Sequence, residues 1–162
     1  MVKFAVHLYL WTEKIDESAI PLIRKAKKMG FDGVEIPLGH LEAINVEKTR
    51  KELKRQNMEC LGSVALSLDH DLTSENEETR RRGIEWMKRC VKVTSDLGGD
   101  LVCGVIYTAW GKITGKSRTE AEWQRSVDAL REISRFAQEY DVTLGIEPIN
   151  RFETYFLNTA SD

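Results

Sequence analysis

Short apolar runs alternate with longer amphipathic stretches along this chain, and this alternation constrains the fold more than any other feature. The apolar runs are rich in strand-forming residues and lie at residues 3–10, 33–38, 58–68, 100–106 and 141–147. Stretches with apolar residues at helical spacing lie between them, at residues 16–30, 46–57, 75–97 and 119–138. Strict β-α alternation predicts a parallel sheet with right-handed crossovers, either a doubly wound open sheet or a (β/α) barrel.

Local signals mark the ends of several predicted elements. Gly30 is expected to end the first helix, and the third strand is expected to end near Gly62 and Ser63. Thr119 and Glu122 have the spacing of a capping box at the start of the last helix. The inward face of that helix is predicted to carry Val127, Leu130, Ile133, Ser134 and Ala137.

The composition describes one globular domain of ordinary polarity over residues 1–162. Hydrophobic residues make up 41% and charged residues 31%, which is enough apolar material for a sizeable core. A net charge of −2 without a basic block gives no electrostatic reason to expect nucleic-acid binding. The apolar runs are too short to cross a bilayer, and the N-terminus lacks the apolar core of a signal peptide, so a cytoplasmic protein without membrane attachment is expected.

Cysteine usage and glycine motifs exclude further functional classes. The cysteines Cys60, Cys90 and Cys103 are scattered among apolar neighbours, so they form neither a disulfide framework nor a zinc spacing. Their expected role is packing. No Gly-x-Gly-x-x-Gly or Gly-x-x-x-x-Gly-Lys-Ser/Thr motif follows a predicted strand, so nucleotide binding has no motif to support it.

Polar and aromatic side chains gather where the predicted strands end. In parallel strands these ends share one rim, which would carry His7, Tyr9, Trp11, Glu35, His40, Ser63, Tyr107, Trp110, Glu147 and Glu153. Carboxylates at such a rim can bind a divalent metal or move protons, and flat aromatic faces suit the C–H faces of a sugar. Structural alternatives exist for four of them: a hydrogen-bonded lining role for His7, hydrophobic cover for Trp11 and Trp110, and a buried ion pair for Glu35.

Two polar segments also have plain structural interpretations. The segment 147–153 could begin a helix, with Pro148 in an early position and Arg151 paired with Glu153 on the surface. The Asp-His-Asp segment 69–71 invites a metal assignment, but adjacent side chains point apart. We therefore expect this loop to be solvated and leave it out of the site.

Residues 146–162 read Ile-Glu-Pro-Ile-Asn-Arg-Phe-Glu-Thr-Tyr-Phe-Leu-Asn-Thr-Ala-Ser-Asp, and supporting segments lie at 7–11, 28–35 and 104–110. Together they resemble the ketose 3-epimerases of the D-tagatose/D-psicose type, within the xylose-isomerase-like sugar isomerase and epimerase superfamily. The resemblance covers essentially the whole chain, but only about the first half of what such enzymes contain. It implies that the sheet is part of a (β/α) TIM barrel.

The resemblance implies a metal-dependent isomerase that inverts carbon 3 of a free ketohexose through an enediolate. In such an enzyme Glu147 is both a metal ligand and one of two acid/base carboxylates, and Glu153 holds the hydroxyl and carbonyl end of the sugar. The other implied substrate-binding residues are Trp110, Val105 and Ile106 on the apolar side, and His7 and Ser63 near the far end. The implied metal is Mn²⁺, with Co²⁺ or Mg²⁺ as alternatives. His7 differs from the tyrosine of some relatives, which leaves the identity of the sugar open.

The resemblance also implies parts that these 162 residues do not include. In the family, an Asp, a His and a second Glu after the fifth strand complete the metal site, and a closed eight-stranded barrel has about 250 residues. We therefore expect an incomplete barrel of about five of the eight β/α units, with weak or no metal binding by this chain alone. Its edge strands at 3–10 and 143–147 would leave backbone groups and apolar surface without partners, which favours a homo-oligomer.

Two alternatives to a free-sugar epimerase stay open at this point. The first is a sugar-phosphate isomerase or epimerase of the same superfamily, although no clear basic cluster lies near the predicted strand ends. The second is a catalytically silent half-barrel that binds sugar weakly or serves as an assembly module.

Overall fold

Five parallel strands form one sheet in the computed structural model, which describes residues 2–162. The strands are β1 (Ala5–His7), β2 (Gly33–Pro37), β3 (Glu59–Leu66), β4 (Leu101–Ala109) and β5 (Thr143–Ile146). The α-helices are α1 (Ile20–Lys28), α2 (Val46–Gln56), α3 (Glu77–Leu97) and α4 (Glu120–Gln138). Short 3₁₀ turns lie at Leu8–Leu10, Glu17–Ala19, Leu41–Ala43 and Leu68–His70. The strand order β1-β2-β3-β4-β5, parallel throughout, confirms the predicted partial (β/α) barrel.

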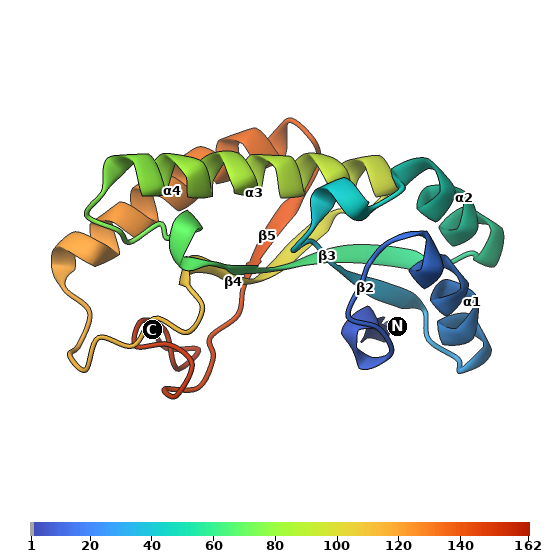
Figure 1. Cartoon of the computed structure of the whole chain (residues 1–162), viewed down its shortest axis with the longest axis horizontal. Helices are drawn as coiled ribbons and strands as arrows, with labels where there is room; N and C mark the ends of the chain where they lie inside the picture. The colour runs from blue at the N-terminus through green and yellow to red at the C-terminus, as the bar shows by residue number, and fades with distance from the viewer. Residues whose placement is uncertain (1) are drawn as a thin grey trace.

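All four α-helices lie on one side of the sheet, with α3 and α4 side by side and α1 and α2 beyond them (Figure 1). The main core fills the space between the sheet and these helices, and includes Ile23, Val34, Met87, Val91 and Ile133. A smaller cluster of Val105, Tyr107, Phe156 and Leu157 fixes the C-terminal segment against β4. Because the helices cover only one face of the sheet, the other face is left for a site.

The predicted capping box of the last helix is confirmed. The Glu122 N–H donates to Thr119 Oγ1 at 3.2 Å, and the Thr119 N–H donates to the Glu122 carboxylate at 2.8 Å. The predicted inward face of α4 is only partly right, because Ser126 and Ala129 are buried whereas Leu130 is half-buried. The hydroxyl of the buried Ser126 donates a hydrogen bond to the Tyr107 carbonyl at 2.7 Å, which offsets the cost of removing this polar group from water.

Three strand boundaries differ from the sequence-based expectation. β1 ends at His7 and a 3₁₀ turn follows, because the His7 side chain accepts a hydrogen bond from the Tyr9 N–H at 3.2 Å and caps that turn. β3 does not end near Ser63 but continues to Leu66, and β4 extends to Ala109. The β3–β4 register shifts by three residues between the pairs Ala65–Val105 and Leu66–Ala109, which carries the end of β4 further along the rim.

Gly104 permits the close approach of β3 and β4 just before this irregularity. Its φ is +125°, and an added Cβ would lie 2.2 Å from the Val64 carbonyl oxygen. We expect Gly104→Ala to lower the free energy of unfolding by about 3 kcal/mol, because backbone would have to move as well as adopt a strained conformation.

The matched control for Gly104→Ala is Gly115→Ala. Gly115 has a φ of +70°, but an added Cβ would meet no atom within 4 Å, so only the left-handed cost of about 1 kcal/mol is expected. Urea unfolding monitored by circular dichroism measures both variants. Equal losses for the two would contradict the close-approach argument.

Within residues 2–162, no helix combines the length and the apolar character that crossing a membrane requires.

Candidate active site

A hollow of about 500 Å³ opens on the uncovered face of the sheet, at the carboxyl ends of the strands. We call it the central hollow; its lining includes His7, Tyr9, Glu35, Ser63, Val105, Trp110, Glu147, Ile149 and Glu153. Five strands or the loops after them contribute to this lining, so residues far apart in the sequence share one surface. The carboxyl ends of the strands are where (β/α) folds place their chemistry.

Six of the seven substrate- or metal-binding residues predicted from the resemblance line this hollow, and Ile106 does not. Ile106 is 0% exposed and belongs to the core between the sheet and the helices. Adjacent residues on a strand point to opposite faces, so Val105 and Ile106 cannot both line the same hollow. Ile106 is therefore corrected from a substrate contact to a core residue.

Three other rim residues also lie outside the lining. Tyr107 is buried beneath the rim, and its hydroxyl donates to the carbonyls of Glu147 at 3.2 Å and Leu157 at 3.4 Å. Trp11 packs against the main core, with the Lys25 ammonium 4.3 Å from its ring centroid. His40 is exposed before the 3₁₀ turn Leu41–Ala43.

The hydrogen bonds of His7 define which of its nitrogens carries the proton. Its Nδ1 accepts from the Tyr9 N–H, so in the neutral ring the proton is on Nε2. That Nε2 lies 3.0 Å from Ser63 Oγ and 3.9 Å from Glu35 Oε1. Because Ser63 accepts from His7, its own hydroxyl proton is free to donate into the hollow.

Glu35 lines the hollow beside this pair and is hydrogen-bonded to Cys103. Cys103 Sγ lies 3.7 Å from Glu35 Oε1 and donates its S–H to that carboxylate. Burial, together with the charges of Glu35 and Glu147, raises the pKa of the Cys103 thiol to about 12. Cys103 therefore stays protonated at neutral pH and acts as a weak donor rather than a nucleophile.

Glu147 and Glu153 lie on the segment that leaves β5. The Glu147 N–H donates to the Gly104 carbonyl at 3.1 Å, which continues the β4–β5 pairing by one residue. Among residues 2–162 the Glu147 carboxylate has neither a hydrogen bond nor an ion pair, so it is available to a ligand. Glu153 accepts a short hydrogen bond from the Asn150 side chain, and its backbone carbonyl accepts from the Gly111 N–H at 2.9 Å.

The alternative interpretation of segment 147–153 as a helix start is not supported. No helix begins at Pro148; the segment is irregular and then forms a turn at residues 151–153. In the described part of the chain Glu153 is bonded to Asn150 and not to Arg151. This geometry directs Glu153 toward the hollow instead of the outer surface.

The residues of this chain do not by themselves fit a metal site. Within residues 2–162, no group of three or more His, Cys, Asp or Glu side chains is arranged to hold an ion. Glu147 is one available carboxylate, whereas Mn²⁺-like ions need several ligands. Any metal held at the hollow would therefore need further protein ligands.

Asp71 is a buried charged residue that sequence reasoning missed. The expectation of a solvated Asp-His-Asp loop is wrong for Asp71, which is only 3% exposed. Lys112 Nζ lies 2.8 Å from Asp71 Oδ2 and 2.9 Å from Thr73 Oγ1, which compensates the buried charge. His70 is half-buried instead, and its ring stacks on Trp86 at 5.1 Å.

The Asp71–Lys112 ion pair predicts a specific dependence of stability on pH. Burial is the largest single influence and opposes ionisation of both groups, but their hydrogen bonds and charge interactions together outweigh it. The pKa of Asp71 is lowered by Lys112 and Thr73, and the pKa of Lys112 is raised by Asp71 and Tyr155. The stabilisation of the fold by this ion pair is therefore complete between about pH 4 and pH 10. It is lost when the pH falls below the lowered pKa of Asp71 or rises above the raised pKa of Lys112. The other charged or titratable groups that face it are Glu122, 3.7 Å from Lys112 Nζ, and the Tyr155 ring, 5.5 Å away.

Urea unfolding of wild type and Asp71→Asn between pH 2 and pH 7 tests this. The loss of stability caused by Asp71→Asn should be largest at neutral pH. It should begin to shrink near pH 4, where the unfolded wild type takes up a proton, and should disappear only below the lowered pKa of folded Asp71. A difference that does not change with pH would contradict the ionised pair.

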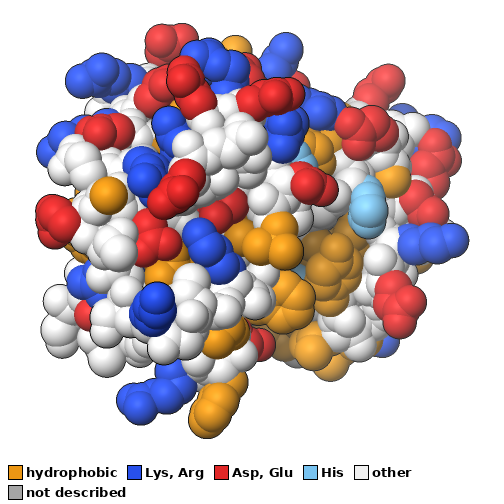
Figure 2. Space-filling view, turned by 60° about the vertical axis from the view of Figure 1, so that its left-hand side comes forward, with side chains coloured by type: hydrophobic (Ala, Val, Ile, Leu, Met, Phe, Trp, Pro, Cys, Tyr) orange, Lys and Arg blue, Asp and Glu red, His pale blue; other side chains and the backbone are white. Residues whose placement is uncertain are grey.

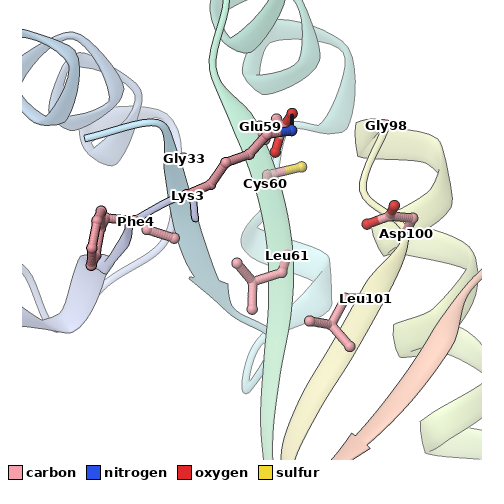
Figure 3. A pocket seen from close by; sticks show the side chains of 10 residues that line it. Lys3, Phe4, Gly33, Glu59, Cys60, Leu61, Gly98, Asp100 and Leu101 are labelled. Carbon is pink, nitrogen blue, oxygen red and sulfur yellow. Dashed lines mark hydrogen bonds and ion pairs between the residues drawn. The ribbon is translucent and has the colours of Figure 1, made fainter. Parts of the chain in front are cut away.

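A second hollow, of about 370 Å³, lies at the amino ends of the strands (Figure 3). Leu61 and Leu101 project from neighbouring strands into it, and Lys3 pairs with Glu59 at its edge. Burial, with the charges of Asp100 and Glu59, raises the pKa of the Cys60 thiol to about 11, so this cysteine is unreactive. We assign no chemistry to this end, because catalytic groups of (β/α) folds lie at the opposite ends of the strands.

Comparison with known proteins identifies a family and several relatives of this chain. Residues 23–162 match the family described as Xylose isomerase-like TIM barrel. The chain is 31% identical over 160 residues to a ketose 3-epimerase of Arthrobacter globiformis, covering 98% of this chain and 55% of that protein. It is 28% identical over 162 residues to an L-ribulose 3-epimerase of Mesorhizobium japonicum, covering 99% and 54%.

Solved structures agree with these sequence matches. A D-allulose 3-epimerase from Methylomonas sp., in complex with D-allulose, has a TM-score of 0.93 and 28% identity, and covers 98% of this chain and 55% of that one. The chain thus spans about half the length of the curated relatives it matches. The likeness extends over the whole sheet and all four α-helices.

Proposed function

We propose that this chain, which belongs to the xylose isomerase-like TIM barrel family, supplies one wall of the active site of a ketose 3-epimerase. The observation that carries the proposal is the central hollow, where Glu147, unpaired among residues 2–162, shares the lining with the Trp110 ring and a second carboxylate, Glu153. Relatives aligned over nearly the whole chain are named ketose and L-ribulose 3-epimerases, which supports a sugar epimerase.

Glu147 is suited to the proton transfer that epimerisation requires. Inverting carbon 3 of a 2-ketose means removing the proton next to the carbonyl and returning a proton on the other face of the enediolate. Glu147 would act on one face, and the carboxylate for the other face would come from outside residues 1–162. A divalent ion, Mn²⁺ or alternatively Co²⁺ or Mg²⁺, would polarise the carbonyl in the complete enzyme, with Glu147 as one of its ligands.

The rest of the hollow would hold the sugar. The exposed Trp110 ring and the Val105 side chain offer an apolar wall for C–H groups, while Glu153 can accept hydrogen bonds from hydroxyls near the reacting carbon. At the other end, the free Ser63 hydroxyl proton and the Glu35 carboxylate provide a donor and an acceptor for distal hydroxyls.

The charge of the hollow favours a free sugar over a sugar phosphate. Its described lining contains Glu35, Glu147 and Glu153 and no Lys or Arg. A phosphate group would be repelled by these carboxylates and would find no guanidinium or ammonium partner. This observation weighs against the sugar-phosphate alternative for the part of the site that this chain forms.

Solvent deuterium incorporation tests the proposed function directly. The chain would be joined to the remaining C-terminal part of the Arthrobacter globiformis relative and incubated with D-fructose and Mn²⁺ in D₂O. We expect deuterium at carbon 3 of the ketose, seen as loss of the H3 signal in proton NMR, together with the C3 epimer. The exposed Glu139 provides the control variant Glu139→Gln, which should exchange at the wild-type rate.

A folded chimera that neither exchanges H3 nor epimerises D-fructose would count against the epimerase and favour a silent binding or assembly module. Exchange that continues at the wild-type rate in Glu147→Gln would remove Glu147 from the proton transfer.

Metal binding by the isolated chain is expected to be weak. Since Glu147 alone offers an unpaired carboxylate at the hollow, calorimetric titration with Mn²⁺ should show no site tighter than about 0.1 mM. The same titration of Glu147→Gln is the control. Stoichiometric micromolar binding that Glu147→Gln abolishes would show a complete site in this chain and overturn the prediction.

A further inference from the structure

A buried polar network lies directly behind the Trp110 wall of the central hollow. Its centre is Asp71, in the loop between β3 and α3. Asp71 Oδ1 accepts hydrogen bonds from the Thr73 N–H at 3.0 Å, the Thr73 hydroxyl at 2.7 Å, the Thr108 hydroxyl at 3.2 Å and the Ala109 N–H at 3.2 Å. One carboxylate therefore ties the β3–α3 loop to the end of β4.

Lys112 extends the network from the other oxygen of Asp71 to α4 and the C-terminal segment. Besides its bonds to Asp71 and Thr73, it lies near the Glu122 carboxylate and the Tyr155 ring. The Tyr155 hydroxyl in turn donates to Glu122 Oε1 at 2.6 Å. Asp71 and Lys112 thus join four segments that are not adjacent in the sequence.

The two anchored positions, Ala109 and Lys112, enclose the dipeptide that forms the wall. Between them, the Trp110 N–H donates to the Leu66 carbonyl at 2.7 Å, and the Gly111 N–H donates to the Glu153 carbonyl at 2.9 Å. Trp110 itself is half-exposed, so its ring has little packing of its own to fix it. The backbone between Ala109 and Lys112 thus carries Trp110 and is hydrogen-bonded to the Glu153 backbone.

We propose that Asp71 and Lys112 are positioning residues that hold Trp110 and Glu153 in place on the wall of the central hollow. The sugar-binding consequence rests on the proposed function, whereas the effect on Trp110 does not. Neither residue lines the hollow, so both act through the backbone at residues 109–112. The network would be needed because Trp110 and Glu153 come from different segments that must be held in register.

Fluorine NMR of the 162-residue chain labelled with 5-fluorotryptophan tests the proposal. The chain has four tryptophans, and Trp110→Phe assigns the resonance of interest. In Asp71→Asn and Lys112→Met, the Trp110 resonance should split or broaden while that of Trp11, which packs against the main core, keeps its wild-type shift. Lys112→Arg, which keeps the charge, should retain a Trp110 signal closer to wild type than Lys112→Met does.

The control variant is Lys116→Met, which removes an exposed lysine from the same loop and should leave all four resonances unchanged. Wild-type Trp110 signals in folded Asp71→Asn and Lys112→Met would overturn the positioning role. If those variants unfold, Thr108→Val decides, because it removes a single bond to Asp71: a perturbed Trp110 signal supports the proposal and an unchanged one refutes it.

Titration with D-fructose separates the positioning role from the proposed function. The Trp110 resonance of the wild-type chain should shift with D-fructose, and the folded Asp71→Asn variant should need about tenfold more sugar for the same shift. No response in wild type would count against a sugar site at this wall, while the sugar-free spectra would still decide the role of Asp71 and Lys112. An equal response in wild type and variant would refute the consequence for sugar binding.

Discussion

The 162-residue chain alone is expected to show no ketose 3-epimerisation above background, and Glu147→Gln in the chimera with the Arthrobacter globiformis C-terminal part should lower turnover about a thousandfold. In both cases one of the two carboxylates of the proposed proton transfer would be missing. An amide at position 147 can neither accept nor return the C3 proton, although its shape is nearly unchanged. Conversion of D-fructose to its C3 epimer, followed by chromatography, measures both effects.

Glu153→Gln is the informative companion to Glu147→Gln. Because Glu153 would hold the sugar without moving the C3 proton, its substitution should raise KM more than it lowers kcat. Robust turnover by the isolated chain that persists in Glu147→Ala would refute both the role of Glu147 and the need for further catalytic residues.

The isolated chain is also expected to self-associate. β1 and β5 are the edges of the sheet, so each pairs with one neighbour only among the described residues. Large hydrophobic side chains are exposed along these edges, including Phe4 at 66% and Ile146 at 48%. Figure 2 shows hydrophobic side chains gathered in a depressed part of the surface between charged regions. Covering such surface is worth about 25 cal/mol per Å², and open strand edges pair readily, so a two-fold dimer is the simplest outcome.

Light scattering of matched variants locates the interface. Ile146→Lys places a charge at the β5 edge and should shift the chain toward the monomer. Ile113→Lys changes an equally exposed isoleucine (53%) in the loop after β4 and should leave the association unchanged. A monodisperse wild-type monomer at micromolar concentration would contradict the prediction and would mean that the open edges and exposed side chains do not drive association.

Element type and order could be predicted from the sequence because they depend on local periodicity and caps. The Thr119–Glu122 capping box shows this, since both partners lie within one helical turn. The extent of β1 could not be predicted, because the His7 side chain binds the Tyr9 N–H and starts a 3₁₀ turn directly after the strand. The buried face of α4 was predicted only in part. Ser126 is buried because its hydroxyl is hydrogen-bonded to the Tyr107 carbonyl on β4, and helix propensity does not indicate such a contact.

Those residues of the candidate site that strand alternation brings to the shared rim could be predicted from the sequence. Residues whose burial depends on a partner far away in the sequence could not. Glu147 and Trp110 directly follow a strand and His7 ends one, so parallel topology alone brings them to one hollow. Asp71 could not be identified in this way, because its compensating charge, Lys112, is 41 residues away and no spacing rule connects them. A charged residue in a loop is usually solvated, and only the fold shows that this one is not.

The strand order β1-β2-β3-β4-β5 also bears on how the chain folds. Within residues 2–162, every strand pairs only with the strands next to it in sequence. No strand therefore has to be inserted between two strands that have already paired. Each β/α unit can be added to an edge that already exists, which keeps loop closures short for a parallel sheet. The fold can therefore grow from the N-terminus as the chain leaves the ribosome, with the newest strand always serving as the template for the next.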